Sequence, residues 1–387
     1  MMLGLLLARA GISVMVLEKH ADFLRDFRGD TLHPSTLEIM HELGVLDRFL
    51  LLPHQKVPRI RGRFGELELT VADFSHLPTQ CRYVAFMPQW DFLNFLAEMG
   101  NCYPGFQVRM NAEVMDLIED ERGIIGLRAE TPNGPIEVHA ALVVGADGRH
   151  SVVRSNAGLS VEEFGAPMDV LWFRLSRRPT DSSDPMGRFD AGRVFIMLYR
   201  GDYWQCGFVI AKGTLSEIRA RGLSAFRDSV VKLAPFVADR VHELQDWESI
   251  KLLTVQVDRL RQWYRAGLLC IGDAAHAMSP VGGVGINLAI QDAVATANLL
   301  AAPLRENCLT TGHLRLVQKR RDWPTKVTQK IQLIAQNRVI KRVLASSKPL
   351  SPPFAFRLIA RFPFLQRIPG RMIGLGVRPE HVRTPSI

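Results

Sequence analysis

The chain has 387 residues, of which 47% are apolar, so it is long enough to bury more than one hydrophobic core. Its five cysteines include no CxxC pair and its 11 histidines show no metal-ligand spacing, so we expect neither a disulfide framework nor a metal site, which suits a reducing cytoplasm. No apolar run approaches about 18 residues, the length that a transmembrane helix needs. The formal net charge is +9, and it is distributed unevenly.

The N-terminal segment has the pattern of a helix followed by a strand. Residues 1–10 carry leucines at helical spacing, and Gly11 stands where a C-terminal helix cap belongs. Residues 12–17 are an apolar strand that ends at Glu18. In a dinucleotide-binding fold, an acidic residue at this point holds the adenosine ribose about 20 residues after a GxGxxG loop. That count runs off the chain, so we expect Met1 to be an internal methionine of a longer protein or to mark a true truncation.

A second apolar run, ALVVGADG, covers residues 141–148 and ends in an Asp-Gly pair. The run is typical of a buried strand. Asp147 and Gly148 alone fit an ordinary β-turn as well as a binding loop, because Asp-Gly is a common turn pair. A third segment, farther along the chain, favours the binding loop.

That third segment, residues 268–292, reads LLCIGDAAHAMSPVGGVGINLAIQD. It starts as a buried parallel strand, and Asp273 places a carboxylate at the carboxyl end, where open α/β sheets bind ligands. Pro280 and several glycines then form a tight loop, and a helix begins at Ile286 with alanines at steps of three and four. A glycine-rich loop that leads into a helix N-terminus is an anion site, because the first amides have no intrahelical partner.

Together, the two segments resemble the GD and DG motifs of the flavoprotein aromatic hydroxylases, the single-component FAD monooxygenases of the p-hydroxybenzoate hydroxylase type. The resemblance implies FAD as cofactor and NADH or NADPH as reductant. Because the GxGxxG loop and the strand before it do not occur, the chain as it stands is expected to retain FAD poorly. The implied fold class is α/β with an α+β substrate lobe: a Rossmann-like FAD-binding domain at residues 1–60, 86–160 and 263–310, an antiparallel-sheet substrate domain at 61–85 and 161–262, and a basic helical C-terminal tail at 311–387.

The resemblance also assigns residues to the cofactor. Asp273 would bind the ribityl chain, and the amides after Gly283 would face the N1–C2=O edge of the flavin. Arg28, in the stretch RDFRGDT, matches an arginine near the phosphates, and a forked guanidinium suits phosphate oxygens. Gln89, at the start of an amphipathic helix, matches a position that touches FAD. The expected cofactor-binding residues are Glu18, Lys19, Arg28, Gln89, Asp147, Asp273, Gly283, Gly285, Ile286 and Asn287.

The middle of the chain is expected to hold the substrate over the flavin. Residues 170–175, 193–199 and 203–210 are strand-like runs separated by turn signals. Most aromatic residues in such strands belong to a core, but five side chains are candidates for the pocket: Trp172, Arg174, Tyr199, Trp204 and Phe208. His276 and Pro280 lie on the loop expected nearest the reacting edge of the flavin. The sequence identifies no catalytic base.

The C-terminal region is strongly basic. From residue 313 onward, 16 Lys and Arg stand against Asp322 and Glu380, a local charge of +14, while the remainder has 32 basic and 37 acidic residues. Such a region can dock on the acidic body, lie on an anionic membrane or bind nucleic acid. A helical apolar stripe favours docking on the body; it consists of Trp323, Val327, Ile331 and Ile334. Phenylalanines alternating with arginines between 354 and 367 leave a weak peripheral membrane contact open. No nucleic-acid motif accompanies the charge, so no such partner is expected.

The implied function is an FAD-dependent, NAD(P)H-using monooxygenase that hydroxylates an aromatic or similar small apolar substrate with O2 through a flavin C4a-hydroperoxide. Two alternatives stay open. The first is another FAD-dependent oxidoreductase of the same fold, such as a reductase or an epoxidase; a halogenase is disfavoured because no WxWxIP segment occurs. The second is an inactive truncated paralogue that binds flavin weakly.

Overall fold

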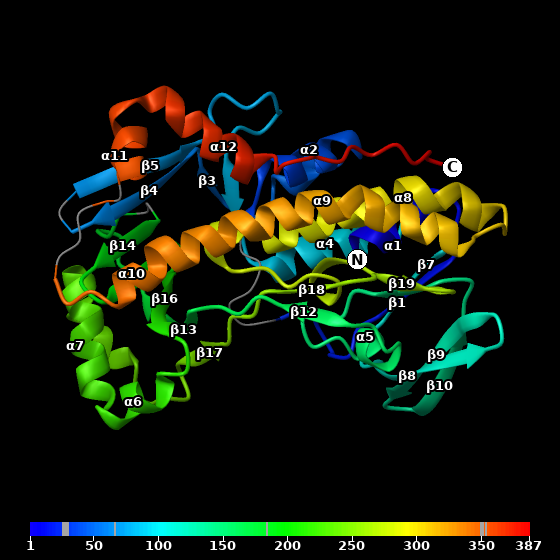
Figure 1. The fold of residues 1–387 in the computed structure, drawn as a ribbon, viewed down its shortest axis with the longest axis horizontal. Coiled ribbons are helices and arrows are strands. Elements are labelled where there is room, and N and C mark those ends of the chain that lie inside the picture. The colour runs from blue at the N-terminus through cyan, green and yellow to red at the C-terminus, as the bar shows by residue number, and fades with distance from the viewer. Residues whose placement is uncertain (25–30, 66, 183–184, 349–351, 353) are drawn as a thin grey trace.

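The computed structural model describes residues 1–387 except 25–30, 66, 183–184, 349–351 and 353. It consists of two halves, and both chain ends lie in the half at the right of Figure 1. A large sheet lies in the other half. Two long helices, α8 (Gly285–Arg305) and α9 (Thr311–Ala335), run side by side along the molecule. The predicted α/β fold class is confirmed.

The right-hand half contains short parallel strand pairs and the helices that cover them. Its elements are α1 (Met2–Arg9), β1 (Val14–Leu17), α4 (Gln89–Gly100), β7 (Phe106–Arg109), β11 (Val143–Gly145), α5 (Val152–Asn156), β19 (Tyr264–Arg265) and β20 (Leu268–Cys270). β1 pairs in parallel with β7, and β11 pairs in parallel with β20. α1 packs against α4 and α8, and Gly11 ends it with a φ of +79°, as its predicted cap role requires. An antiparallel sheet lies beside α5: β8 (Glu113–Asp120), β9 (Gly123–Thr131) and β10 (Gly134–His139).

The other half is built on a seven-stranded sheet. From edge to edge its strands are β17 (Lys251–Leu253), β13 (Met168–Ser176), β16 (Tyr203–Ala211), β15 (Arg193–Tyr199), β14 (Met186–Asp190), β4 (Arg59–Phe64) and β5 (Leu67–Asp73). All neighbours are antiparallel except β14 and β4, whose parallel pairing joins two distant parts of the chain. One face of the sheet packs on α6 (Leu215–Ala220) and α7 (Leu223–Leu233) in a separate apolar core.

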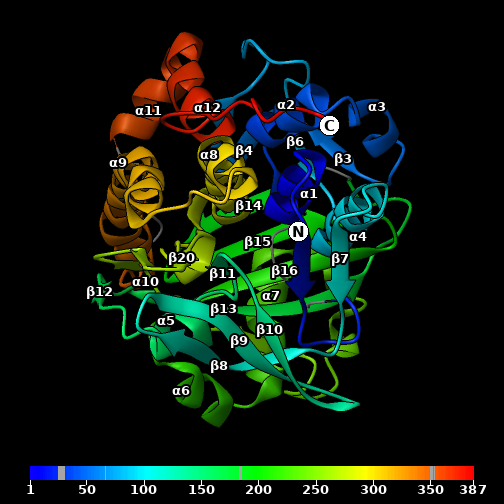
Figure 2. The same cartoon turned by 90° about the vertical axis from the view of Figure 1, so that its right-hand side faces the viewer.

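Smaller elements complete the fold. They are β2 (Thr31–Leu32), α2 (Pro34–Glu42), α3 (Leu46–Phe49), β3 (Gln55–Val57), β6 (Val84–Phe86), β12 (Val161–Glu163) and β18 (Asp258–Leu260). After α9 the chain continues through a π-helical turn at Gln336–Ile340, α10 (Lys341–Leu344), α11 (Phe354–Arg361) and α12 (Arg367–Gly374). In Figure 2, α9, α11 and α12 lie on the same side of the molecule.

The C-terminal region docks on the body, but not through the predicted stripe. Trp323, Ile331 and Ile334 are 56%, 39% and 48% exposed. α9 instead buries a largely polar face that includes Arg321, Thr325, Gln329 and Gln332. The prediction that the apolar stripe docks on the body was therefore wrong. The surface that α9 covers consists of irregular backbone, and its polar groups need hydrogen-bond partners.

One segment, Val281–Arg305, is long and apolar enough to cross a membrane by length and composition. Of its most apolar window, 67% is buried inside the fold. This segment is α8 with the turn before it, and it serves as a core helix.

Candidate functional site

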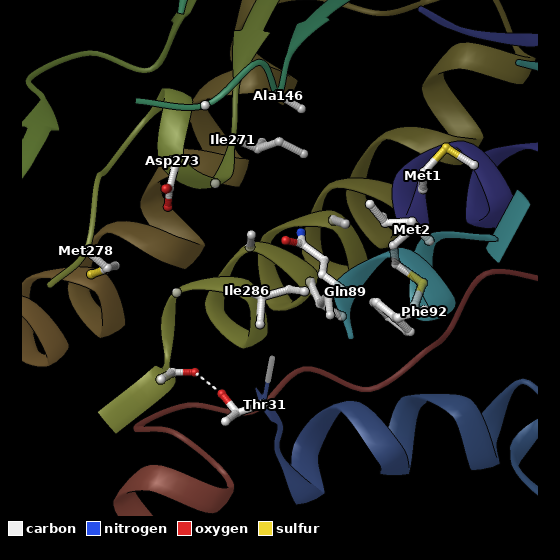
Figure 3. A pocket seen from close by; sticks show the side chains of 18 of the residues that line it. Met1, Met2, Thr31, Gln89, Phe92, Ala146, Ile271, Asp273, Met278 and Ile286 are labelled. Atoms are coloured by element: carbon white, nitrogen blue, oxygen red, sulfur yellow. Dashed lines mark hydrogen bonds between the residues drawn. The ribbon is translucent and has the colours of Figure 1, made fainter. Parts of the chain in front are cut away.

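One continuous cavity of about 2210 Å³ extends through both halves. Ligand pockets usually measure about 300–1,000 Å³, so this space is large enough for two ligands side by side. At one end it is lined by β1 and the start of α1, and at the other by the seven-stranded sheet. Figure 3 shows the middle of the cavity, where Asp273 and Gln89 point into the same space.

The predicted GD loop forms one wall of this middle region. β20 ends at Cys270, and a short 3-10 turn then carries Asp273 to the cavity wall. Gly282 and Gly283 follow with φ values of +81° and +61°, a conformation that favours glycine. A Cβ on Gly283 would lie 2.4 Å from Oγ1 of Thr31, so the loop and β2 touch closely. These glycines let the loop turn sharply into α8.

The first turn of α8 presents free amides to the cavity. The first i→i−4 hydrogen bond of the helix runs from the Leu288 amide to the Val284 carbonyl at 2.9 Å. The amides of Gly285, Ile286 and Asn287 precede it and have no intrahelical acceptor. Gly285 and Ile286 line the cavity, and a Cβ on Gly285 would come no closer than 3.8 Å to a neighbouring atom. A planar ligand can therefore approach this turn.

The side chain of Asn287 has a structural role that the sequence did not indicate. Its amide group donates to the Thr31 and Gly283 carbonyls at 2.9 and 3.2 Å. Its oxygen accepts from the His33 amide and from Oγ1 of Thr36, both at 2.8 Å. Asn287 thus fixes the glycine loop against β2 and α2, while its backbone amide remains at the helix end.

The DG loop lies beside the GD loop, because β11 and β20 pair in parallel and the two loops follow the same end of that pair. Asp147 follows β11, lines the cavity and accepts hydrogen bonds from Oγ of Ser151 at 2.5 Å and from the Val153 amide at 3.1 Å. Arg149 lies 3.7 Å from the Asp273 carboxylate and also lines the cavity. This contact joins the two motifs, and sequence spacing could not show it because the residues are far apart in the chain.

The remaining predicted cofactor residues lie at the far end of the cavity, in its middle or outside the described chain. Glu18 directly follows β1, lines the cavity and accepts a hydrogen bond from the His20 amide at 3.0 Å. Lys19 lines the rim and lies 3.7 Å from Glu113, with both side chains more than half exposed. Gln89 begins α4 and lines the cavity. Arg28 falls outside the described residues.

His276 lies away from the cavity, contrary to the prediction that it sits near the reacting edge. It is buried, and its Nε2 lies 2.6 Å from Oδ2 of Asp292. Asp292 also accepts from Nε of Arg321 at 2.9 Å and from the Gly272 amide at 3.1 Å. Burial alone would raise the pKa of Asp292, but His276 and Arg321 hold it below its ordinary value. His276 therefore belongs to a buried charge network behind the loop, whereas Pro280 does line the cavity.

Of the five substrate candidates, Trp172 lines the cavity, whereas the other four do not: Arg174, Tyr199, Trp204 and Phe208. Tyr199, Trp204 and Phe208 instead point to the core under α7. Side chains alternate between the two faces of a strand, and these three fall on the face away from the cavity. Arg174 is exposed near the end of β13, with its guanidinium 4.9 Å from the Tyr203 ring.

Over β13, β15 and β16 the cavity face of the sheet is apolar, and its members alternate as the pleat requires, whereas β4 adds Arg59 and Arg61 to the lining. The apolar members include Met168, Val170, Trp172, Val194, Ile196 and Val209. Gly207 lies opposite Trp172 in the β13–β16 register, and a Cβ there would lie 3.0 Å from the indole ring. Gly207 therefore leaves room for the indole to lie across the sheet. Ile340 and Phe356 cover this compartment from the C-terminal region.

His33 reaches the cavity from the segment after β2. Its Nδ1 lies 2.7 Å from the Ile373 carbonyl, so Nδ1–H donates. Burial lowers the pKa of His33 to about 4, against the opposing effect of that hydrogen bond. The imidazole is therefore neutral at pH 7.

The residues present fit the expected FAD. The carboxylates of Glu18 and Asp273 suit ribose and ribityl hydroxyls, and the first amides of α8 suit the carbonyl edge of a flavin ring. Gly285 lines the cavity without a side chain, so a ring could approach these amides closely.

Comparison with known proteins agrees with this fit. A family model described as an FAD binding domain matches residues 1–331. The 6-methylpretetramide 4-monooxygenase of Streptomyces rimosus is 30% identical over 372 residues, which cover 95% of this chain and 88% of that protein. The 12-dehydrotetracycline 5-monooxygenase/anhydrotetracycline 6-monooxygenase of Streptomyces rimosus subsp. rimosus is 27% identical over 308 residues, covering 76% of this chain and 59% of that protein. The structure of p-nitrophenol 4-monooxygenase PnpA from Pseudomonas putida DLL-E4 superposes with a TM-score of 0.77 at 18% identity, covering 97% of this chain and 95% of that one.

Proposed function

The chain belongs to the FAD-binding-domain family and to its FAD-dependent aromatic monooxygenases, and from this premise we propose that it hydroxylates a large, mostly apolar aromatic substrate with O2 and NADH or NADPH. The observation that carries the proposal is the continuity of the cavity. The apolar compartment over Trp172 opens directly onto the first turn of α8, without a wall between them. A ring bound over the sheet would therefore lie beside the flavin edge.

FAD, when bound, supplies the oxygen-activating redox chemistry. Glu18 would hold its ribose and Asp273 its ribityl chain. The amides of Gly285, Ile286 and Asn287 would stabilise negative charge on the reduced ring, since they are fixed donors at the positive end of a helix. Arg149 and Asp147 line the same space from the neighbouring DG loop. The apolar sheet face and the cover formed by Ile340 and Phe356 would exclude water from the reacting atoms.

The apolar lining and the relatives favour a multi-ring substrate over a single phenol. The cavity of about 2210 Å³ would be shared with FAD, so a substrate would use the part over the seven-stranded sheet. Two relatives are named for 6-methylpretetramide and for tetracycline-type compounds, and substrates of comparable size would use the room over β13, β15 and β16. Seven apolar side chains of β13, β15 and β16 line the compartment, so the bound ring system would be held chiefly by burial.

A turnover experiment tests the proposal. Purified protein supplied with FAD would be mixed with NADH or NADPH and a panel of phenols that ranges from single rings to fused polycyclic compounds. We expect multi-ring compounds to accelerate NAD(P)H oxidation and to yield a product that carries one atom from ¹⁸O₂, detected by mass spectrometry. Stimulated oxidation with hydrogen peroxide as the sole oxygen product would favour a reductase of the same fold. Trp172→Ala should lower product yield while FAD binding stays intact, because Trp172 belongs to the substrate compartment alone.

A further inference from the structure

The C-terminal helices carry an exposed surface that combines apolar and basic side chains. We call it the C-terminal outer face; its members are Phe354, Leu358, Phe362, Phe364, Ile368 and Met372, with Arg357, Arg361, Arg367 and Arg371. Phe354 and Phe364 are 71% and 61% exposed, which is unusual for phenylalanine. The six apolar residues are close together in the sequence, on α11, α12 and the short turn between them.

Close packing on the opposite side fixes which face of these helices points outward. A Cβ on Gly370 would lie 2.1 Å from the Asp73 carbonyl oxygen, and one on Gly374 would lie 2.6 Å from Leu77. α12 therefore sits with its glycine side directly on the end of β5. α11 contributes Phe356 to the cavity wall, and α12 contributes Ile373. The outer face is thus the outside of a wall whose inner side lines the substrate compartment.

The charge of this surface is of one sign. No acidic residue occurs between residue 354 and Glu380, whereas four arginines stand in that stretch before Gly374. All four side chains are exposed. The rest of the chain, up to residue 312, carries a net charge of −5 against +14 for the region after it. The molecule is therefore polarised, and an anionic surface would attract this side and repel the other.

We propose that the C-terminal outer face docks on an anionic phospholipid membrane. Helices that lie in a membrane interface combine exposed aromatic and aliphatic residues with Lys or Arg beside them, as here. The arginines would contact the lipid headgroups while the phenylalanines enter the interface. A second copy of this chain fits less well, because two such surfaces would bring eight arginines together without an acidic partner. Docking would place the substrate compartment directly behind the membrane-facing wall.

Vesicle sedimentation of the full chain with FAD tests this proposal. We expect the protein to pellet with vesicles of phosphatidylglycerol and phosphatidylcholine, and to remain in solution with phosphatidylcholine alone. Binding should fall steeply in about 1 M salt, where the Debye length is about 3 Å. The charge-reversal variant Arg357→Glu/Arg361→Glu should lower the partition coefficient roughly tenfold or more. Phe354→Ser/Phe364→Ser should do the same at low salt, because it removes the inserted apolar side chains.

A matched control keeps the result specific to this surface. Arg122→Glu/Arg221→Glu reverses two exposed charges on other parts of the molecule and should bind vesicles like the unchanged protein. Circular dichroism and the flavin spectrum would verify that every variant is folded. Equal binding to neutral vesicles, or unchanged binding by both outer-face variants, would overturn the proposal. So would lipid-free dimers, seen in sedimentation velocity, that the Phe354→Ser/Phe364→Ser variant abolishes, since they would assign the face to a second copy.

Discussion

Helices α8 and α9 pack against each other, but the side chains that they bury differ. α8 buries an apolar face that includes Ala293, Val294, Ala297 and Leu300. α9 buries Arg321, Gln329 and Gln332 and leaves Trp323 and Ile331 exposed. The contrast follows from what each helix covers. α8 lies in the main apolar core, which α9 joins only at its start through Leu314 and Val317. The later part of α9 covers the irregular backbone of the GD loop.

The glutamines of α9 supply hydrogen bonds that the loop backbone lacks. Gln332 donates to the Ser279 and Val281 carbonyls at 2.8 Å, and its oxygen accepts from the Ser279 amide at 3.2 Å. Gln329 donates to the Asp258 and Ala277 carbonyls at 2.7 and 3.2 Å. A loop shaped to bind a ligand cannot pair its own backbone groups as a helix or sheet does. A polar helix face is therefore the means by which this loop is buried and still rigid.

Substitution of Arg321 is expected to cause the largest loss of stability. Arg321→Met would leave the carboxylates of Asp292 and Glu380 without this cation, and both are buried. Removal of one partner from a buried ion pair typically costs about 3–5 kcal/mol, so urea denaturation should show a loss of this size. Lys326→Met on the same helix removes a half-exposed partner of Asp322 and should cost less than about 1 kcal/mol. Similar stability of the two variants would mean that the buried polar face of α9 contributes no more to the free energy of unfolding than its exposed face does.

His33 gives a pH-dependent effect of comparable size. The folded pKa is about 4, below the ordinary value of 6.5, so the unfolded chain binds a proton there at a higher pH than the folded chain. Stability from neutral His33 is therefore present above about pH 6.5 and is lost as pH falls toward about 4. The total is on the order of 3 kcal/mol. His33→Asn, which lacks the titration, should lose stability less steeply across that window. If the free energy of unfolding fell equally with pH in the two proteins, His33 would not be the group whose lowered pKa causes the loss.

The two helices also show how much sequence alone could predict. The strand ends, the glycine turns and the start of α8 were predicted to within one or two residues, because each depends on residues that are adjacent in the chain. The buried face of α9 was mispredicted, because apolar periodicity assumes an apolar neighbour. Tyr199, Trp204 and Phe208 were assigned to the wrong side for a related reason: both faces of their sheet are apolar and covered, so alternation does not reveal which one faces the ligand. The Arg149–Asp273 contact and the bonds of the Asn287 side chain depend on tertiary structure, and no local pattern signals them.

Gln332→Leu tests the loop support directly. The change keeps the size of the side chain but leaves the Ser279 and Val281 carbonyls without their donor, at a cost of about 1–3 kcal/mol. FAD affinity should fall as well, because the loop before α8 loses its support. Thermal denaturation and flavin fluorescence titration would measure the two effects. Lys330→Leu, on the exposed side of α9, serves as the control. A destabilised variant with unchanged FAD affinity would show that Gln332 supports the fold without shaping the site.

Asp273→Ala should affect the cofactor more than the fold. Asp273 is partly exposed at the cavity wall beside Arg149, so its loss removes a ligand partner rather than a core contact. We expect FAD binding to weaken by about 1–3 kcal/mol, measured by equilibrium titration, with little change in the melting temperature of the flavin-free protein. Asp273→Asn should retain part of the affinity, because an amide still hydrogen-bonds hydroxyls. Unchanged affinity in the alanine variant would remove Asp273 from the site.

Substitution of Trp323 is expected to cause the smallest loss of stability. It distinguishes the apolar contact face predicted for α9 from the polar face that the structure buries. If the sequence stripe were the docking face, Trp323→Ser would open a cavity and cost about 3–5 kcal/mol, as loss of a buried aromatic ring does. In the structure the indole is 56% exposed, so the cost should stay below about 0.5 kcal/mol. Trp204→Ala is the matched comparison: its side chain is 2% exposed in the core under α7 and its Nε1 donates to Asp181 at 3.1 Å. Urea denaturation of both variants should show a difference of several kcal/mol, because burial rather than residue type determines the cost. Equal losses would mean that Trp323 is buried and that α9 lies on the body through its apolar side.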